Sequence, residues 1–140
     1  MNAGQKFVTK IAFNNIPLIG SILKEVLEYS DDMYLNTRLE KLEDQLKLIN
    51  KYESFLRELT NLSEHRYFTF RTNLKFLLTT ALPEITDSFI SALIESVVGG
   101  QQNMAEEICE ILRQLNANDI ETLKMLKGNV EKNKEKINAG

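Results

Sequence analysis

Apolar residues recur every three or four positions along most of this 140-residue sequence. That spacing follows the turn of an α-helix and places the apolar side chains on one helix face. Only two prolines and six glycines interrupt the chain, so long stretches contain no residue that ends a helix. The sequence therefore predicts an all-α fold, a helical bundle of about five to six helices that share one core.

The periodicity and the capping residues delimit the predicted helices. The longest is expected over about 31–62, because Asp31 or Asp32 offers an N-cap and no glycine or proline follows until well past Leu62. Pro83 suits the first turn of another helix, which reaches about Val98. The remaining segments that fit helices are 3–14, 17–29, 64–81, 102–115 and 118–128.

The C-terminal region predicts a boundary in the chain. Asn118 followed three residues later by Glu121 resembles a capping box, and Gly128 offers an end to the short helix that it opens. No apolar face is evident beyond that glycine. We therefore expect a single helical-bundle domain over residues 1–128 and a charged tail or linker over 129–140.

The predicted long helix carries a seam of apolar residues. Their spacing of four, three, four and three is typical of an antiparallel hairpin or a short coiled coil. The seam is a candidate interface for a second copy or another protein, although a neighbouring helix of the same chain would satisfy it equally well. Its members are Leu35, Leu39, Leu42, Leu46 and Ile49.

Charge and cysteine content narrow the classes of partner. The formal net charge of −3 and the pI of about 5.3 mean that phosphate backbones would repel the chain as a whole, so nucleic acid is not the default partner. Cys109 is the only cysteine, which excludes an internal disulfide. Residues 1–10 show no signal peptide, and together these features predict a cytoplasmic protein.

One stretch, residues 65–76, alternates cations with aromatic residues. Arg66, Arg71 and Lys75 in it form a candidate flank for an anionic partner, whose binding would be sensitive to salt. On a helix, however, the aromatic residues separate from these cations. The alternative is an amphipathic core helix with a basic outer side.

Residues that could carry chemistry do not form a recognisable catalytic or metal-binding pattern. The positions three and four residues from His65 hold no usual metal ligand, and Cys109 has acidic neighbours, which disfavour a reactive thiolate. Glu84, Asp87 and Glu95 form a carboxylate stripe that fits either oxygen ligands for a hard cation or the wet edge of a buried helix. We therefore expect no enzyme, no cofactor and no small-molecule ligand.

The N-terminal segment suggests a different kind of contact. Phe7, Ile11 and Phe13, interspersed with lysines, could lie in a bilayer interface if the segment detached from the bundle. A permanent membrane span over residues 76–98 is disfavoured, because three carboxylates and Pro83 interrupt it. Peripheral contact with a membrane on activation therefore remains open.

Two segments resemble a known family. Residues 16–21 (IPLIGS), which precede a long charged helix, and residues 111–123 (ILRQLNANDIETL) are similar to bacterial proteins of the abortive-infection alpha type. The resemblance implies a helical bacterial protein connected with phage defence, and the family supplies no agreed catalytic residues. Two hypotheses follow: an interaction module that self-associates or docks a partner, or a membrane-perturbing effector that releases its N-terminal helices.

Overall fold

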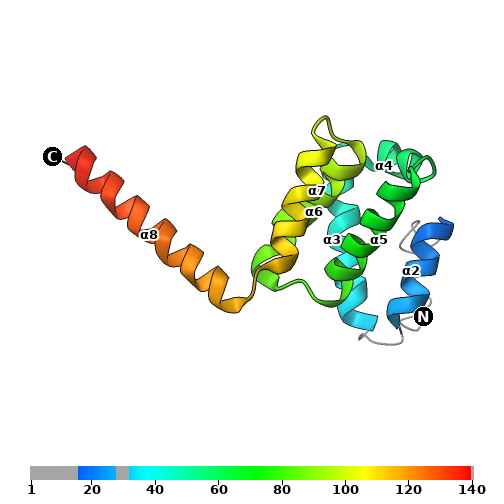
Figure 1. Cartoon of the computed structure of the whole chain (residues 1–140), viewed down its shortest axis with the longest axis horizontal. Coiled ribbons are helices and arrows are strands. Elements are labelled where there is room, and N and C mark those ends of the chain that lie inside the picture. The colour runs from blue at the N-terminus through cyan, green and yellow to red at the C-terminus, as the bar shows by residue number, and fades with distance from the viewer. Residues whose placement is uncertain (1–15, 28–31, 140) are drawn as a thin grey trace.

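The computed structural model describes residues 16–27 and 32–139. Within these ranges the regular structure is entirely α-helical, which confirms the predicted all-α fold, although seven helices exceed the expected five to six (Figure 1). The helix predicted over residues 3–14 lies outside the described residues. The seven helices are α2 (Pro17–Leu27), α3 (Asp32–Leu48), α4 (Tyr52–Leu59), α5 (Glu64–Thr79), α6 (Pro83–Val98), α7 (Gln102–Gln114) and α8 (Ala117–Ala139).

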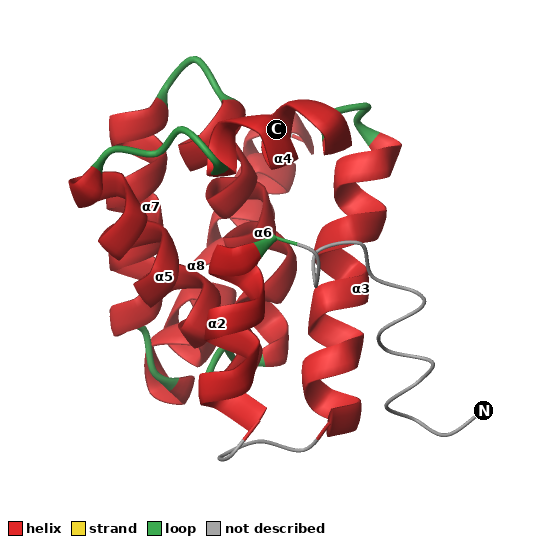
Figure 2. Ribbon diagram, turned by 90° about the vertical axis from the view of Figure 1, so that its right-hand side faces the viewer, coloured by secondary structure: helices red, strands yellow, loops and turns green. Residues whose placement is uncertain are grey.

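Helix α6 forms the centre of the bundle and packs against α3, α4, α5 and α7, while α2 packs on α5 (Figure 2). This position follows from its sequence, because apolar residues cover most of the helix surface. Its two buried hydroxyls are satisfied locally: Thr86 donates to the Leu82 carbonyl and Ser96 to the Leu93 carbonyl. The apolar residues that it buries are Ile85, Phe89, Ile90, Ala92, Leu93, Ile94 and Val97.

The long helix predicted over 31–62 is interrupted, so it forms two helices, α3 and α4. Asn50 has a φ of 59°, in the left-handed region that asparagine tolerates better than most residues. The Asn50 N–H donates to the Lys47 carbonyl and the Lys51 N–H to the Leu46 carbonyl, a Schellman arrangement that ends α3. The prediction of one helix was wrong because it depended on glycine and proline alone as helix-ending residues.

The connection between α7 and α8 consists of two residues, Leu115 and Asn116. The Asp119 N–H donates to Asn116 Oδ1 over 2.9 Å, and the Asn116 N–H donates to Asp119 Oδ2 over 3.0 Å. This reciprocal pair is a capping box two residues before the one predicted at Asn118, and it satisfies two backbone donors at the start of α8.

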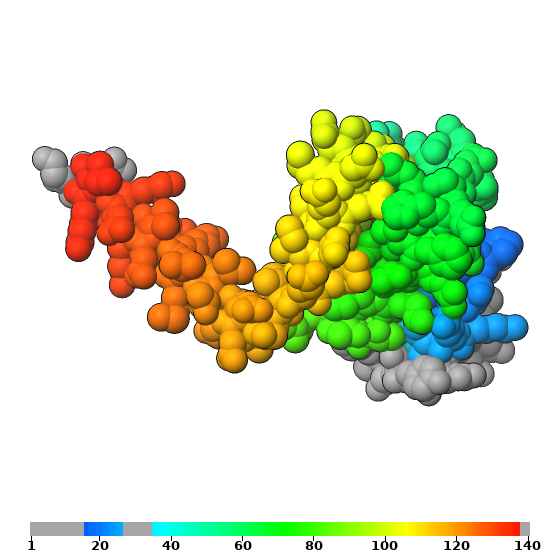
Figure 3. Space-filling view, in the orientation of Figure 1, coloured from blue at the N-terminus to red at the C-terminus, as the bar shows by residue number. Residues whose placement is uncertain are grey.

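Helix α8 continues through Gly128 to Ala139, so the predicted helix end at that glycine was wrong. Figures 1 and 3 show the helix projecting from the end of α7, with a V-shaped notch between the two. Ile120 in its first turn is buried. Apart from Gly128, every residue from Glu121 to Ile137 is exposed, and we call residues 121–137 the arm.

The interior also contains polar side chains that a hydrophobic pattern does not explain. The buried guanidinium of Arg38 in α3 donates to Thr86 Oγ1 and to the Ala81 carbonyl, so it ties α3 to the start of α6. Asn73 in α5 is fully buried, and neither its amide nitrogen nor its oxygen has a hydrogen-bond partner. Such an unpaired amide costs about 1–3 kcal/mol of stability.

Candidate interaction surface

The apolar seam predicted as an interface lies inside the bundle. Leu35, Leu39, Leu42 and Leu46 are fully buried in the core, and only Ile49, at the end of α3, is exposed, at 42%. Since α5 and α6 cover α3, the four leucines are not available to a second chain. The structure thus corrects the predicted interface in favour of its alternative, a seam satisfied by helices of the same chain.

Two cations of the predicted anionic-partner flank are engaged within the chain. Glu25 in α2 accepts hydrogen bonds from Arg71, at 2.5 Å, and from Lys75, at 2.8 Å. The bonds from Lys75 and then Arg71 hold the pKa of the Glu25 carboxyl below its ordinary value, and the partnership raises the pKa of Arg71. These ion pairs fasten α2 to α5.

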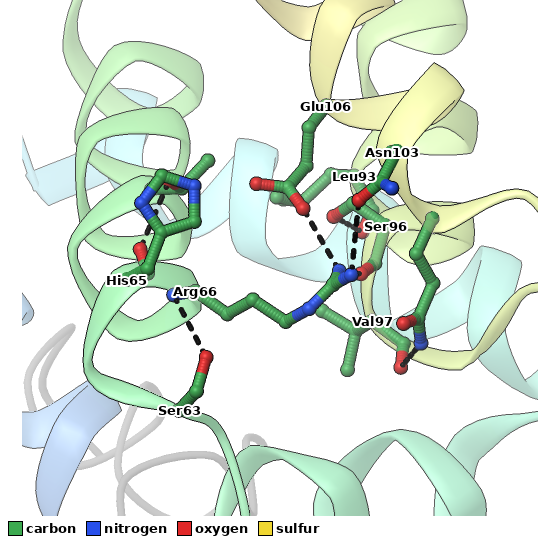
Figure 4. Close-up of polar contacts among 10 residues, drawn as sticks. Ser63, His65, Arg66, Leu93, Ser96, Val97, Asn103 and Glu106 are labelled. Carbon is green, nitrogen blue, oxygen red and sulfur yellow. Dashed lines mark hydrogen bonds and ion pairs between the residues drawn. The ribbon is translucent and has the colours of Figure 1, made fainter.

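Arg66, the third cation of that flank, spans from α5 to α6 and α7 (Figure 4). Its guanidinium donates to Glu106 Oε1 at 2.8 Å, to Asn103 Oδ1 at 3.1 Å and to the Ser96 carbonyl at 3.4 Å. All three cations of the predicted flank therefore bind carboxylates of this chain. The structure corrects the flank to a set of inter-helix ties, because a cation beside a fixed carboxylate gains little from a second anion.

The residues considered for catalysis are not brought together. Cys109 is buried in α7, and burial raises the pKa of its thiol to about 12, so the thiol stays protonated. His65 is exposed on α5. Glu84, Asp87 and Glu95 lie on the exposed side of α6, as expected for the wet edge of a buried helix. No group of three or more potential metal ligands occurs among the described residues.

The structure bears on only part of the predicted membrane contact. Phe7, Ile11 and Phe13 lie outside the described residues, so their predicted membrane face stays a prediction. Over residues 16–27 and 32–139, no helix is both long enough and apolar enough to cross a bilayer.

An uncovered apolar stripe runs along α7. Met104, Ile108 and Ile111 follow one another at intervals of four and three residues, and they are 56%, 41% and 59% exposed. The neighbouring side of the same helix is buried through Ala105 and Cys109. Helix α7 is therefore apolar on two sides, only one of which the bundle covers.

Beside this stripe an open groove of about 390 Å³ runs between α6 and α7. Met104, Ala105 and Ile108 line it from α7. Near the α6–α7 loop the Gln101 N–H donates to Glu95 Oε1 over 3.2 Å, which holds that carboxylate at the groove. The α6 residues that line the groove are Ser88, Ser91, Ala92 and Glu95.

A second exposed apolar stripe runs along the arm. Leu123, Leu126, Val130 and Ile137 are separated by three, four and seven residues, so they share one helix face. Each is more than half exposed, and Ile137 reaches 78%. An isolated helix of this length is only marginally stable in water, so a stripe of this kind is typical of a helix that docks on another surface.

The two stripes lie in regions of opposite charge. Residues 83–114, which form α6 and α7, contain six carboxylates and one arginine, a net charge of −5. The arm, residues 121–137, contains five lysines and three glutamates, a net charge of +2. The overall charge of the chain conceals this division between an acidic helical hairpin and a basic arm.

The sequence contained a signal for both stripes. In α7 the apolar face, which runs from Met104 to Leu112, is too broad for one buried side. In the arm, Val130 and Ile137 continue the spacing of Leu123 and Leu126, but the assumed helix end at Gly128 hid this continuity. A check for periodicity across the glycine would have found the arm.

Comparisons with protein-family models, with curated proteins and with solved structures give no significant match to this chain. The similarity of residues 16–21 and 111–123 to abortive-infection alpha proteins therefore stays a prediction.

Proposed function

We propose that this chain is a non-enzymatic helical interaction module that acts by self-association or by docking a protein partner. The observation that carries the proposal is the pair of uncovered apolar stripes, one on α7 and one on the arm. Exposed apolar residues aligned on one helix face are a feature of docking surfaces, whereas single scattered ones are ordinary.

The composition of the stripes also supports docking. Met104 supplies a side chain that adapts to irregular surfaces, and Ile108, Ile111 and Val130 supply rigid branched ones. Charged residues border both stripes, which is the usual arrangement of an apolar centre with a polar rim.

The biological setting proposed for the module is bacterial phage defence of the abortive-infection kind. This part depends on the resemblance of residues 16–21 and 111–123 alone. The function then requires the stripes to bind a protein, whether a second copy or another component of the same system.

In-cell photo-crosslinking tests the docking function. A photoreactive amino acid placed at Ile111, on the α7 stripe, should give a discrete covalent adduct with a protein in bacterial cells. The matched control places it at Glu58, an exposed position on α4. If position 111 gives no adduct beyond that of position 58, the proposed docking function is wrong.

A plating assay tests the phage-defence setting. Cells that produce the chain should reduce phage plating, and Ile108→Asp or Val130→Asp should abolish the reduction while Met125→Asp preserves it. Met125 is the matched control because it is exposed on the arm but lies off the apolar stripe. If both stripe variants protect fully, defence does not depend on this surface. If the wild-type chain gives no protection, the proposed phage-defence setting is wrong.

The second candidate function is a membrane-perturbing effector. One observation favours it: α2 has an apolar face, Ile19, Ile22, Leu23 and Val26, that would be exposed if the helix left α5. The Glu25 ion pairs that fasten α2 are partly solvent-exposed and would be a point of release.

Dye release from anionic vesicles tests this alternative. An effector should release dye, and charged substitutions at Phe7 and Ile11 should abolish the release. Unchanged leakage in such a variant, or none from the wild-type chain, would count against membrane insertion by these helices.

A further inference from the structure

We propose that the arm of one copy docks in the α6–α7 groove of a second copy, and that the exchange is reciprocal. This inference rests on the proposed docking function and names its partner. The resulting dimer would have a two-fold axis, with the same two contacts formed twice.

The connection to α7 keeps the arm away from its own groove. Only Leu115 and Asn116 separate the helices, and the reciprocal hydrogen bonds between Asn116 and Asp119 fix the first turn of α8. Burial of Ile120 anchors that turn to the bundle. Folding the arm back onto α7 would require α8 to turn about Leu115 and Asn116 and would take Ile120 out of its buried position, whereas a second copy can receive the arm while Ile120 stays buried.

The dimensions of the arm and the receiving surface agree. At 1.5 Å per residue, the part of the arm stripe from Leu123 to Val130 extends about 10 Å, as does the α7 stripe from Met104 to Ile111. Both stripes also follow spacings of three and four residues. Helices of this kind pack with the side chains of one between those of the other.

Charge favours the groove over a second arm as the docking site. Lys127, Lys134 and Lys136 flank the arm stripe and Glu131 is the carboxylate at a comparable position, so two arms paired along their stripes would gather more lysines than carboxylates at their margins. The groove is lined by the exposed carboxylate Glu95 instead, and Glu107 is exposed on α7 beside the stripe. An arm seated there would place its lysines near these glutamates.

Sedimentation equilibrium on the full chain tests the dimer directly. The wild-type chain should be a dimer at about 100 µM, well above the dissociation constants of most specific interfaces. Ile108→Asp in the groove and Val130→Asp in the arm should each raise the dissociation constant on the order of 100-fold, as expected for loss of a central apolar anchor. Met125→Asp should leave it unchanged. All three positions are exposed, so each variant is expected to fold, and circular dichroism checks that it does.

Mixing the two variants distinguishes exchange from other dimers. In a mixed dimer, the intact arm of the Ile108→Asp chain meets the intact groove of the Val130→Asp chain, so one of the two contacts is restored. An equimolar mixture should therefore dimerise more strongly than either variant alone. Two arms paired as a coiled coil would instead be indifferent to Ile108→Asp and would not be rescued by mixing.

The outcomes separate this inference from the proposed function. A strictly monomeric wild-type chain, or a dimer unaffected by Ile108→Asp, overturns the exchange. If the probe at position 111 then crosslinks a different protein, docking stands without self-association. If it crosslinks nothing beyond the control, the proposed function fails as well.

Discussion

Helices α6 and α8 have apolar residues at similar helical spacing, yet the two meet opposite environments. In α6, Phe89 and Leu93 are fully buried among four neighbouring helices. In α8, Leu126 and Val130 are exposed on a projecting arm. The comparison teaches that periodicity identifies the face of a helix that will pack, but not the molecule against which it packs.

The two helices differ in how much of their surface is apolar, and this difference explains why one is buried and the other is exposed. Apolar residues occupy most of the circumference of α6, so it needs cover on several sides. The apolar stripe of the arm is narrow and lysines flank it, so a single partner surface is enough to cover it. The bundle is therefore expected to fold without the arm's contribution.

The largest expected effect comes from shortening a buried leucine. Leu42→Ala in α3 should lower the free energy of unfolding by about 2–5 kcal/mol, because it leaves a cavity in the core. The matched change Leu126→Ala in the arm should cost less than about 0.5 kcal/mol in dilute protein. Urea denaturation measures both. Equal losses would mean that the arm belongs to the cooperative bundle.

The buried amide of α5 provides the next test. Asn73→Leu should raise the free energy of unfolding by about 1–2 kcal/mol, because it removes two unpaired buried polar atoms. Asn133→Leu in the exposed arm should leave the unfolding of the bundle unchanged. A destabilised Asn73→Leu protein would show that the amide has a stabilising role that its contacts do not reveal.

A smaller effect is expected at the glycine inside the arm. Gly128→Ala should favour the helical arm by about 0.5–1 kcal/mol, because alanine loses less backbone entropy and a Cβ there would meet no atom within 4 Å. NMR chemical shifts of residues 122–137 should report more helix. Gly100→Ala, in a loop with similar space, is the control. A rise in the unfolding midpoint of the bundle would contradict the independence of the arm.

The smallest effect concerns the attachment of α2. Because the pKa of Glu25 is lowered in the folded chain, its ion pairs stabilise the fold above the ordinary value of 4.5, and this contribution is lost as the pH falls through the lowered pKa. The hydrogen-exchange protection factors of residues 17–27, which are relative to the intrinsic exchange rate at each pH, should therefore fall below pH 4.5. Glu25→Gln should remove this dependence and Glu121→Gln should not. An equal loss of protection in the Glu25→Gln protein would assign the change to other groups.

Much of the fold was predictable because its determinants are local. Helix α6 runs from Pro83 to Val98 as predicted, and Ser63 caps α5 by accepting a hydrogen bond from the Arg66 N–H. The break at Asn50 was missed because a left-handed asparagine gives a weaker signal than glycine.

The candidate surface was less predictable than the fold, because it depends on which apolar residues remain uncovered. The seam at Leu35, Leu39, Leu42 and Leu46 and the outer stripe of α7 have the same spacing, yet the first is core and the second is surface. The basic flank was also hard to predict, because the pairing of its cations depends on residues far away in the sequence. No local pattern in the sequence indicates that Glu25, which lies 46 residues before Arg71, pairs with the Arg71 guanidinium.

By itself, the sequence determined that this chain is helical, where most of its helices begin and end, and which face of each is apolar. Those properties follow from backbone propensity, capping and side-chain spacing, which act within one or two turns. Only the tertiary structure decided which apolar faces are buried, which cations are paired, and that α8 projects as a basic arm beside an acidic groove. Burial and pairing depend on distant segments, and residues of any separation in the sequence can meet once the chain has folded.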